Sequence, residues 1–83
     1  MAIAGVVIVT QREKTMRVLE KLNTTANVTT YGVHNDIQIV AVLESDSSKG
    51  LEKLSVELQE KIDGILGLYP AYVTTEDEME NLV

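Results

Sequence analysis

The sequence predicts an α+β fold with the element order βαββαβ. This is a ferredoxin-like sandwich, in which two helices cover one face of a four-stranded antiparallel sheet. Apolar residues recur at helical spacing in two segments, and four segments rich in β-branched or aromatic residues alternate with them in that order. The chain has 83 residues, a length that suits one domain over residues 1–83 with one core. Pro70, in the last strand, cannot donate to a β-ladder and confines that strand to a sheet edge, as the expected order 4-1-3-2 requires.

The first strand and helix are expected near the N-terminus. Ile3 to Val9 is apolar at every position except Gly5, which suits a strand. The next four residues, TQRE, have the form of a capping box, in which Thr10 accepts from the backbone and Glu13 reaches back. A helix should therefore start there and end at the turn-forming sequence NTTAN. Its apolar stripe consists of Thr15, Val18, Leu19 and Leu22.

A β-hairpin is expected next. VTTYGV, residues 28–33, has strand character, His34-Asn35-Asp36 supplies turn chemistry, and IQIVAVLE, residues 37–44, alternates along its length. Gln38 and Glu44 share a phase with two valines, so this set should point away from the helices. Ile39, Ala41 and Leu43 should then point toward the helices.

The second helix and the fourth strand complete the pattern. Serine or aspartate in SDSSKG is a candidate N-cap, and Gly64 is the glycine expected just past a helix C-terminus. ILGLYPAYVT, residues 65–74, is the fourth strand, and the acidic tail from about residue 76 is expected to be frayed. The apolar stripe of the helix consists of Leu51, Leu54, Leu58 and Ile62.

The face of the sheet away from the helices is predicted to be apolar and uncovered. The phase of the first strand stays open, because the set Gly5, Val7 and Val9 and the alternative set one residue earlier are both apolar. On the fourth strand Tyr69, with Gly67 and Ala71, is placed outward, since a tyrosine between small residues suits a platform whose hydroxyl stays wet. An apolar face of this kind indicates a binding surface.

Composition and charge exclude several classes of function. The chain has 7 basic and 13 acidic residues, a net charge of −6, which argues against nucleic acid and favours a neutral or basic partner. It has no cysteine, which excludes a disulfide framework, a thiolate zinc site and a cysteine nucleophile. The N-terminal apolar run is too short to span a bilayer and has no basic region before it, so we expect a cytoplasmic protein without membrane insertion.

Catalytic, metal-binding and cofactor-binding residues are not expected. His34 is the single histidine and lies in the predicted turn, and no second imidazole or thiol can complete a transition-metal site. Gly64 and Gly67 are too sparse and wrongly placed for a phosphate-binding loop. The sequence therefore predicts a binding protein that is not an enzyme.

Four segments of the chain resemble one family. They are GVVIV in the first strand, VLEKLN in the first helix, IQIVAVLESDS from the third strand into the second helix, and IDGILGLYPAYV near the end. Together with the length and the acidic C-terminal tail, they resemble the NapD family, the small cytoplasmic chaperones of the periplasmic nitrate reductase system. Pro70 departs from the family pattern, in which a good strand former is usual, and the turn HND lacks glycine.

The resemblance implies a function. The family binds the twin-arginine signal peptide of the catalytic nitrate reductase subunit, in helical form, on the open sheet face. This binding is thought to delay export until the molybdenum cofactor of that subunit is in place. The implied peptide-binding residues are Gly5, Val7, Val9, Gln38, Val40, Val42, Tyr69 and Ala71.

The arginine pair of such a peptide would be attracted to carboxylates. The candidates are Glu44, Asp46, Glu76, Asp77 and Glu78. An alternative of another class is a small-molecule-sensing ferredoxin-like regulatory domain that acts as a homodimer.

Overall fold

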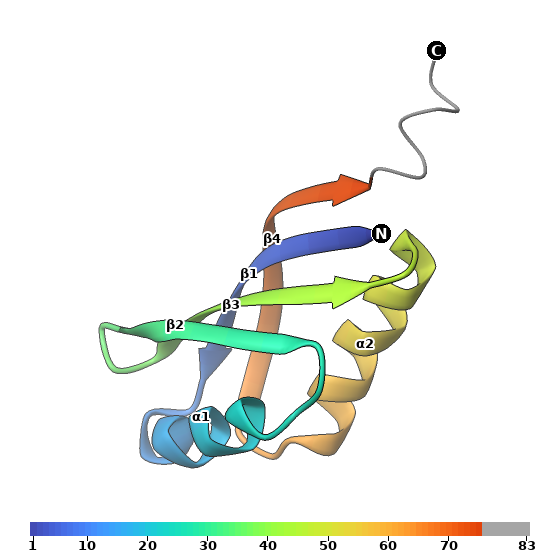
Figure 1. Cartoon of the computed structure of the whole chain (residues 1–83). Helices are drawn as coiled ribbons and strands as arrows, with labels where there is room; N and C mark the ends of the chain where they lie inside the picture. Colours follow the sequence, from blue (N-terminus) through green and yellow to red (C-terminus); the bar gives the residue numbers. More distant parts are fainter. Residues whose placement is uncertain (76–83) are drawn as a thin grey trace.

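The computed structural model describes residues 1–75 and has the predicted order of elements (Figure 1). The strands are β1 (Ala2–Thr10), β2 (Val28–His34), β3 (Gln38–Ser45) and β4 (Ile65–Thr75). The helical segments are the short 3-10 helix η1 (Arg12–Lys14), α1 (Thr15–Asn23) and α2 (Ser48–Lys61). The acidic tail, with Glu76, Asp77 and Glu78, lies outside the described residues.

The described strands form one antiparallel sheet with the order β2-β3-β1-β4, which confirms the predicted ferredoxin-like topology. β1 and β3 are its central strands. Pro70 lies in β4, an edge strand, where a residue without an N–H donor is tolerated. Within residues 1–75, no helix combines the length and apolar character needed to cross a membrane.

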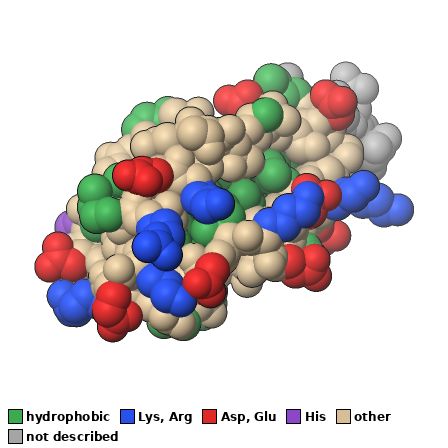
Figure 2. Space-filling model, turned by 90° about the horizontal axis from the view of Figure 1, so that it is seen from below, with side chains coloured by type: hydrophobic (Ala, Val, Ile, Leu, Met, Phe, Trp, Pro, Cys, Tyr) green, Lys and Arg blue, Asp and Glu red, His purple; other side chains and the backbone are tan. Residues whose placement is uncertain are grey.

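The basic residues of the chain all belong to its helical segments. Figure 2 shows Lys and Arg side chains among Asp and Glu on the underside of the molecule in the view of Figure 1, where α1 lies. The strands therefore carry no Lys or Arg. The seven residues are Arg12, Lys14, Arg17, Lys21, Lys49, Lys53 and Lys61.

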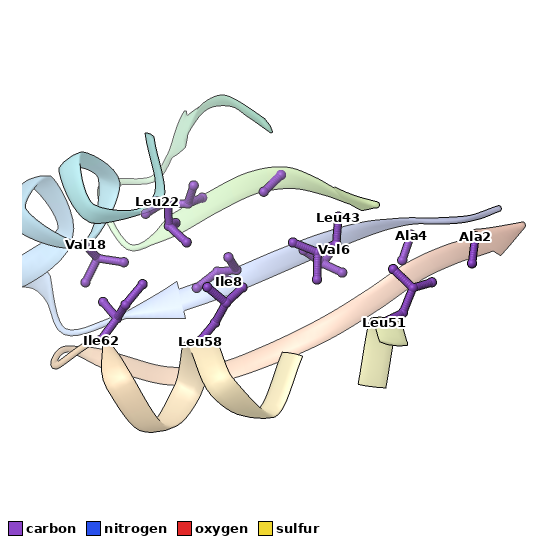
Figure 3. Packing of buried hydrophobic residues seen from close by; sticks show 12 residues of the cluster. Ala2, Ala4, Val6, Ile8, Val18, Leu22, Leu43, Leu51, Leu58 and Ile62 are labelled. Carbon is purple, nitrogen blue, oxygen red and sulfur yellow. The ribbon is translucent and has the colours of Figure 1, made fainter. Parts of the chain in front are cut away.

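The core lies between the sheet and the two helices, as Figure 3 shows. Ile39, Ala41 and Leu43 of β3 are buried on this side, as predicted, and Val6 and Ile8 of β1 join them. The structure thereby fixes the phase of β1, which the sequence left open. The predicted apolar stripes of both helices pack here, since their residues are buried or packed against the buried cluster. The buried helical residues are Thr15, Val18, Leu22, Leu51 and Leu58, with Ile62 at the end of α2.

The β2–β3 hairpin turns through three residues, Asn35, Asp36 and Ile37, without glycine. Asn35 and Asp36 have positive φ values of 53° and 64°, and the Ile37 N–H donates to the His34 carbonyl. Positive φ at both central residues gives the turn type whose twist matches paired strands. Asn and Asp adopt this conformation more readily than other side chains, so the turn HND serves where glycine is common.

The predicted capping box at the start of the first helix is wrong. Thr10 still belongs to β1 and is buried; its hydroxyl lies 2.6 Å from the Thr15 hydroxyl and donates to the Ile37 carbonyl at 3.3 Å. The N-cap position of η1 is Gln11, with no side-chain cap. Thr10 thus ties β1 to α1 and to the hairpin, and this tertiary role replaces the local one that its spacing to Glu13 suggested.

The predicted cap of the second helix is confirmed. The Ser47 hydroxyl accepts a hydrogen bond from the Gly50 N–H at 3.1 Å. We expect Ser47→Ala to lower the free energy of unfolding by about 1 kcal/mol, because a helical N–H loses its acceptor. Urea denaturation measures this. Ser47→Asp keeps an acceptor and should stay near the wild type; an equal loss in both variants would contradict the capping role.

An ion pair joins the end of η1 to the loop after α2. The Lys14 Nζ lies 2.7 Å from a carboxylate oxygen of Asp63, and this bond, with the charge of Lys14, lowers the pKa of Asp63 below its ordinary value of 3.8. Because the pKa is lower in the folded state, the pair stabilises the protein above about pH 4, and this contribution is lost as the pH falls through the folded-state pKa.

The pair can be tested by titration. Carbon-detected NMR of the Asp63 carboxyl should give a pKa below 3.8 in the wild type, and Lys14→Met should return it toward that value. The same pKa in both proteins would show that Lys14 does not perturb this carboxyl.

Candidate functional site

The sheet surface opposite the helices forms a single face, and we call its part on β1, β3 and β4 the open face. The outward residues of these three strands, placed in register by the sheet, are Ile3, Gly5, Val7 and Val9; Gln38, Val40, Val42 and Glu44; Gly67, Tyr69, Tyr72 and Thr74. On β1 and β3 these positions alternate with the buried core residues. None of the basic side chains of the protein belongs to it.

Cross-strand pairing arranges the open face in rows. Val40, Val7 and Tyr69 form the central row, and Gln38, Val9 and Gly67 form the row toward the β2–β3 turn. On the other side lie first the row Val42, Gly5 and Tyr72, and then the end row Glu44, Ile3 and Thr74. The structure therefore brings together seven of the eight implied peptide-binding residues.

The eighth, Ala71, is displaced by a β-bulge. The register shifts between Gly5 and Val6, so that Val6 pairs with Pro70, Gly5 pairs with Tyr72, and Ala71 has no partner on β1. Ala71 is exposed, but Tyr72 takes the next place on the open face. Strict alternation from Tyr69 missed this residue. Pro70 was the available signal, because proline in a sheet favours edges and bulges.

Two glycines make room for the tyrosine rings. A Cβ built on Gly5 would overlap the ring of Tyr72, and a Cβ built on Gly67 would overlap the ring of Tyr69. The Tyr72 ring therefore crosses from β4 over β1, while the Tyr69 ring lies along β4. Both tyrosine residues are still more than half exposed, 54% for Tyr72 and 59% for Tyr69.

The centre of the open face is apolar and accessible. Val40 is 42% exposed, and Val7, Val9 and Val42 are partly exposed although they stand on the central strands. Contiguous apolar surface of this kind is unusual on a monomer and marks interaction sites. It can bind an apolar stretch of a partner.

Basic side chains are absent from the described strands, whereas acidic side chains lie in both layers of the molecule. Lys and Arg are confined to the helical segments, whereas Glu44 lies at the end of the open face and Asp46 follows β3 directly. Because the open face has no Lys or Arg, the carboxylates of Glu44 and Asp46 would attract a cationic group to this end of it.

A separate cavity of about 280 Å³ lies on the helix side of the sheet, between α2 and β4. Its volume is slightly below the range of about 300–1,000 Å³ typical of ligand pockets. Its apolar lining includes Ala4, Val6, Leu43, Leu51, Pro70 and Val73. In the part of the chain that the structure describes, no group of three or more His, Asp or Glu residues is placed to hold a metal ion.

Comparison with known proteins gives a family match. A family model described as NapD protein matches residues 1–77. No curated protein matches the sequence significantly.

Two solved structures share the fold. A solution structure of the E. coli Tat proofreading chaperone protein NapD superposes with a TM-score of 0.75 at 17% identity, covering 84% of this chain and 74% of that one. A crystal structure of a hypothetical protein from Pyrococcus horikoshii also gives a TM-score of 0.75, at 25% identity and with 89% of each chain covered.

Proposed function

The chain belongs to the NapD family, and on that premise we propose that it is a cytoplasmic maturation chaperone whose open face binds the twin-arginine signal peptide of the catalytic subunit of periplasmic nitrate reductase. Bound in this way, the precursor is held back from export until its cofactor is inserted. The chaperone itself performs no catalysis in this scheme. Its role is to sequester a peptide.

The observation that carries the proposal is the open face itself. A twin-arginine signal peptide combines an apolar stretch with a pair of arginines. The rows centred on Val7, Val40 and Tyr69 supply an apolar surface for the stretch. The carboxylates at one end and the lack of Lys and Arg in the strands suit the arginines.

Binding would be coupled to folding of the peptide. A signal peptide that is disordered when free must lose conformational freedom to become a helix on the sheet, which costs about 2–5 kcal/mol of the interaction energy. Part of the energy gained by burying apolar surface is offset in this way. The complex can therefore delay export and still release the peptide.

The carboxylates contribute mainly to the approach of the peptide. Glu44 is partly exposed and Asp46 is exposed, and ion pairs at such positions contribute roughly 0–1 kcal/mol each. Glu76, Asp77 and Glu78 lie in the tail, outside the described residues. Apolar contacts should therefore contribute more to the peptide affinity than ion pairs do, and the affinity should change little with salt concentration.

Isothermal titration calorimetry with three synthetic peptides tests the proposal. One peptide has the twin-arginine sequence, one has glutamines in place of the arginines, and one has serines in place of the apolar residues. We expect saturable one-to-one binding of the first, weaker binding of the second and no binding of the third. Equal affinity for all three peptides would contradict specific recognition.

Sedimentation equilibrium of the free protein distinguishes the alternative. A homodimer that does not bind the signal peptide would mean that a second copy covers the open face. The small-molecule-sensing regulatory domain would then be the better description.

A further inference from the structure

The open face changes in chemistry along its strands. The row toward the β2–β3 turn and the central row present valines with Tyr69, whereas the end row presents Glu44. The Tyr72 ring lies in the row between the valine-rich centre and this carboxylate. The two ends of the face therefore suit different parts of a ligand.

Tyr72 owes its place to the bulge in β4. Because Ala71 is left unpaired, Tyr72 comes opposite Gly5, and its ring reaches over β1 only because Gly5 has no Cβ. Tyr72 as a residue is 54% exposed. An aromatic ring in this position offers a surface on which a planar cation can stack.

Glu44 belongs to the row of the open face next to that of the Tyr72 ring. Val42 shares the row of Gly5 and Tyr72, and Glu44 is two residues further along β3, about 7 Å along the strand. A guanidinium group is long and planar enough to stack on an aromatic ring while it donates to a carboxylate. The pair offers arginine two kinds of contact.

We propose that Tyr72 and Glu44 together receive an arginine of the bound signal peptide and so fix the direction of the peptide on the open face. This inference rests on the proposed function. The basic part of a signal peptide precedes its apolar part in sequence. The peptide therefore begins at the Glu44 end and runs with its apolar stretch toward Val9 and Gln38.

A thermodynamic cycle tests the role of Tyr72. Tyr72→Leu, which keeps an apolar side chain, should lower the affinity for the twin-arginine peptide by about three- to fivefold and leave the affinity for the glutamine peptide unchanged. Tyr72→Phe keeps the ring and should bind both peptides like the wild type. An equal loss for both peptides on Tyr72→Leu would overturn arginine stacking, because the ring would then be a plain apolar contact.

Gly5→Ala provides a second variant that leaves Tyr72 in the sequence. The new Cβ would displace the ring from β1, and the ring can move because it is an exposed side chain. We expect the same selective loss for the arginine peptide, with the melting temperature close to that of the wild type. The Gly5 Hα, which lies beneath the ring in the wild type, provides a ring-current shift that reports the displacement independently. Unchanged affinity with a displaced ring would overturn the proposal.

The direction of the peptide is measured with a nitroxide label placed just before the arginine pair. The amide signals of Ile3 and Glu44 should broaden strongly, and those of Gln38 and His34 should not. The reverse pattern, or uniform broadening, would overturn the direction while leaving signal-peptide binding intact. A twin-arginine peptide that does not bind the wild type at all would instead contradict the proposed function.

Discussion

Replacing Val40 with aspartate is expected to abolish peptide binding and to leave the domain folded. Val40 lies in the central row of the open face, beside Val7, and has 42% of its surface exposed. A carboxylate there stays hydrated in the free protein. In the complex it would be buried against an apolar peptide segment, so we expect affinity to fall about a hundredfold or more. Calorimetry with the twin-arginine peptide measures the loss.

Val56→Asp is the matched control for this experiment. Val56 is an exposed valine of α2, 51% accessible, in the helical layer, so the same substitution there should leave peptide affinity unchanged. Circular dichroism should show both variants folded. If Val40→Asp binds the peptide like the wild type, the peptide does not use the open face.

The same substitution one residue earlier should instead unfold the protein. Ile39 is fully buried between the sheet and the helices. Ile39→Asp removes a large apolar side chain and places an unpaired carboxylate in the core, which should cost at least about 4 kcal/mol. A domain of 83 residues buries a smaller fraction of its surface than a larger one, so its stability should lie near the lower end of the usual range of about 5–15 kcal/mol, and this substitution should remove most of it.

Urea denaturation followed by circular dichroism measures this effect. The two variants distinguish the two faces of β3, since Ile39→Asp should unfold the domain and Val40→Asp should only abolish peptide binding. A cooperative transition of Ile39→Asp at the wild-type midpoint would show that the core does not lie on the helix side of this strand.

For β3 the sequence predicted which side chains point toward the helices, and for β1 it did not. The difference has a physical reason. On β3 the polar residues Gln38 and Glu44 share one phase, which identifies the side away from the core. On β1 every position from Ile3 to Val9 except Gly5 is apolar, and each of the two phases fits equally well. Only packing against α1 and α2 decides between them, and this depends on tertiary contacts that a local pattern does not contain.

Two predictions from the sequence, the capping box at TQRE and the open-face residues of β4, were wrong because of tertiary contacts. The TQRE sequence has the spacing of a capping box, but the Thr10 hydroxyl is engaged with Thr15 and the Ile37 carbonyl, which are close only in the folded chain. On β4, Pro70 correctly indicated an edge strand, yet the bulge at Ala71 also depends on pairing with β1. Tyr72 was therefore missed on the open face, although Tyr69 was placed there.

Titration of isotope-labelled protein with the twin-arginine signal peptide, followed by amide NMR, tests directly whether the open face binds the peptide. We expect saturable shifts concentrated on the open-face rows of β1, β3 and β4, with Val7, Val40 and Tyr72 among the largest. Shifts confined to α2 and the cavity beside it, or no saturable shifts, would contradict a peptide site on the open face.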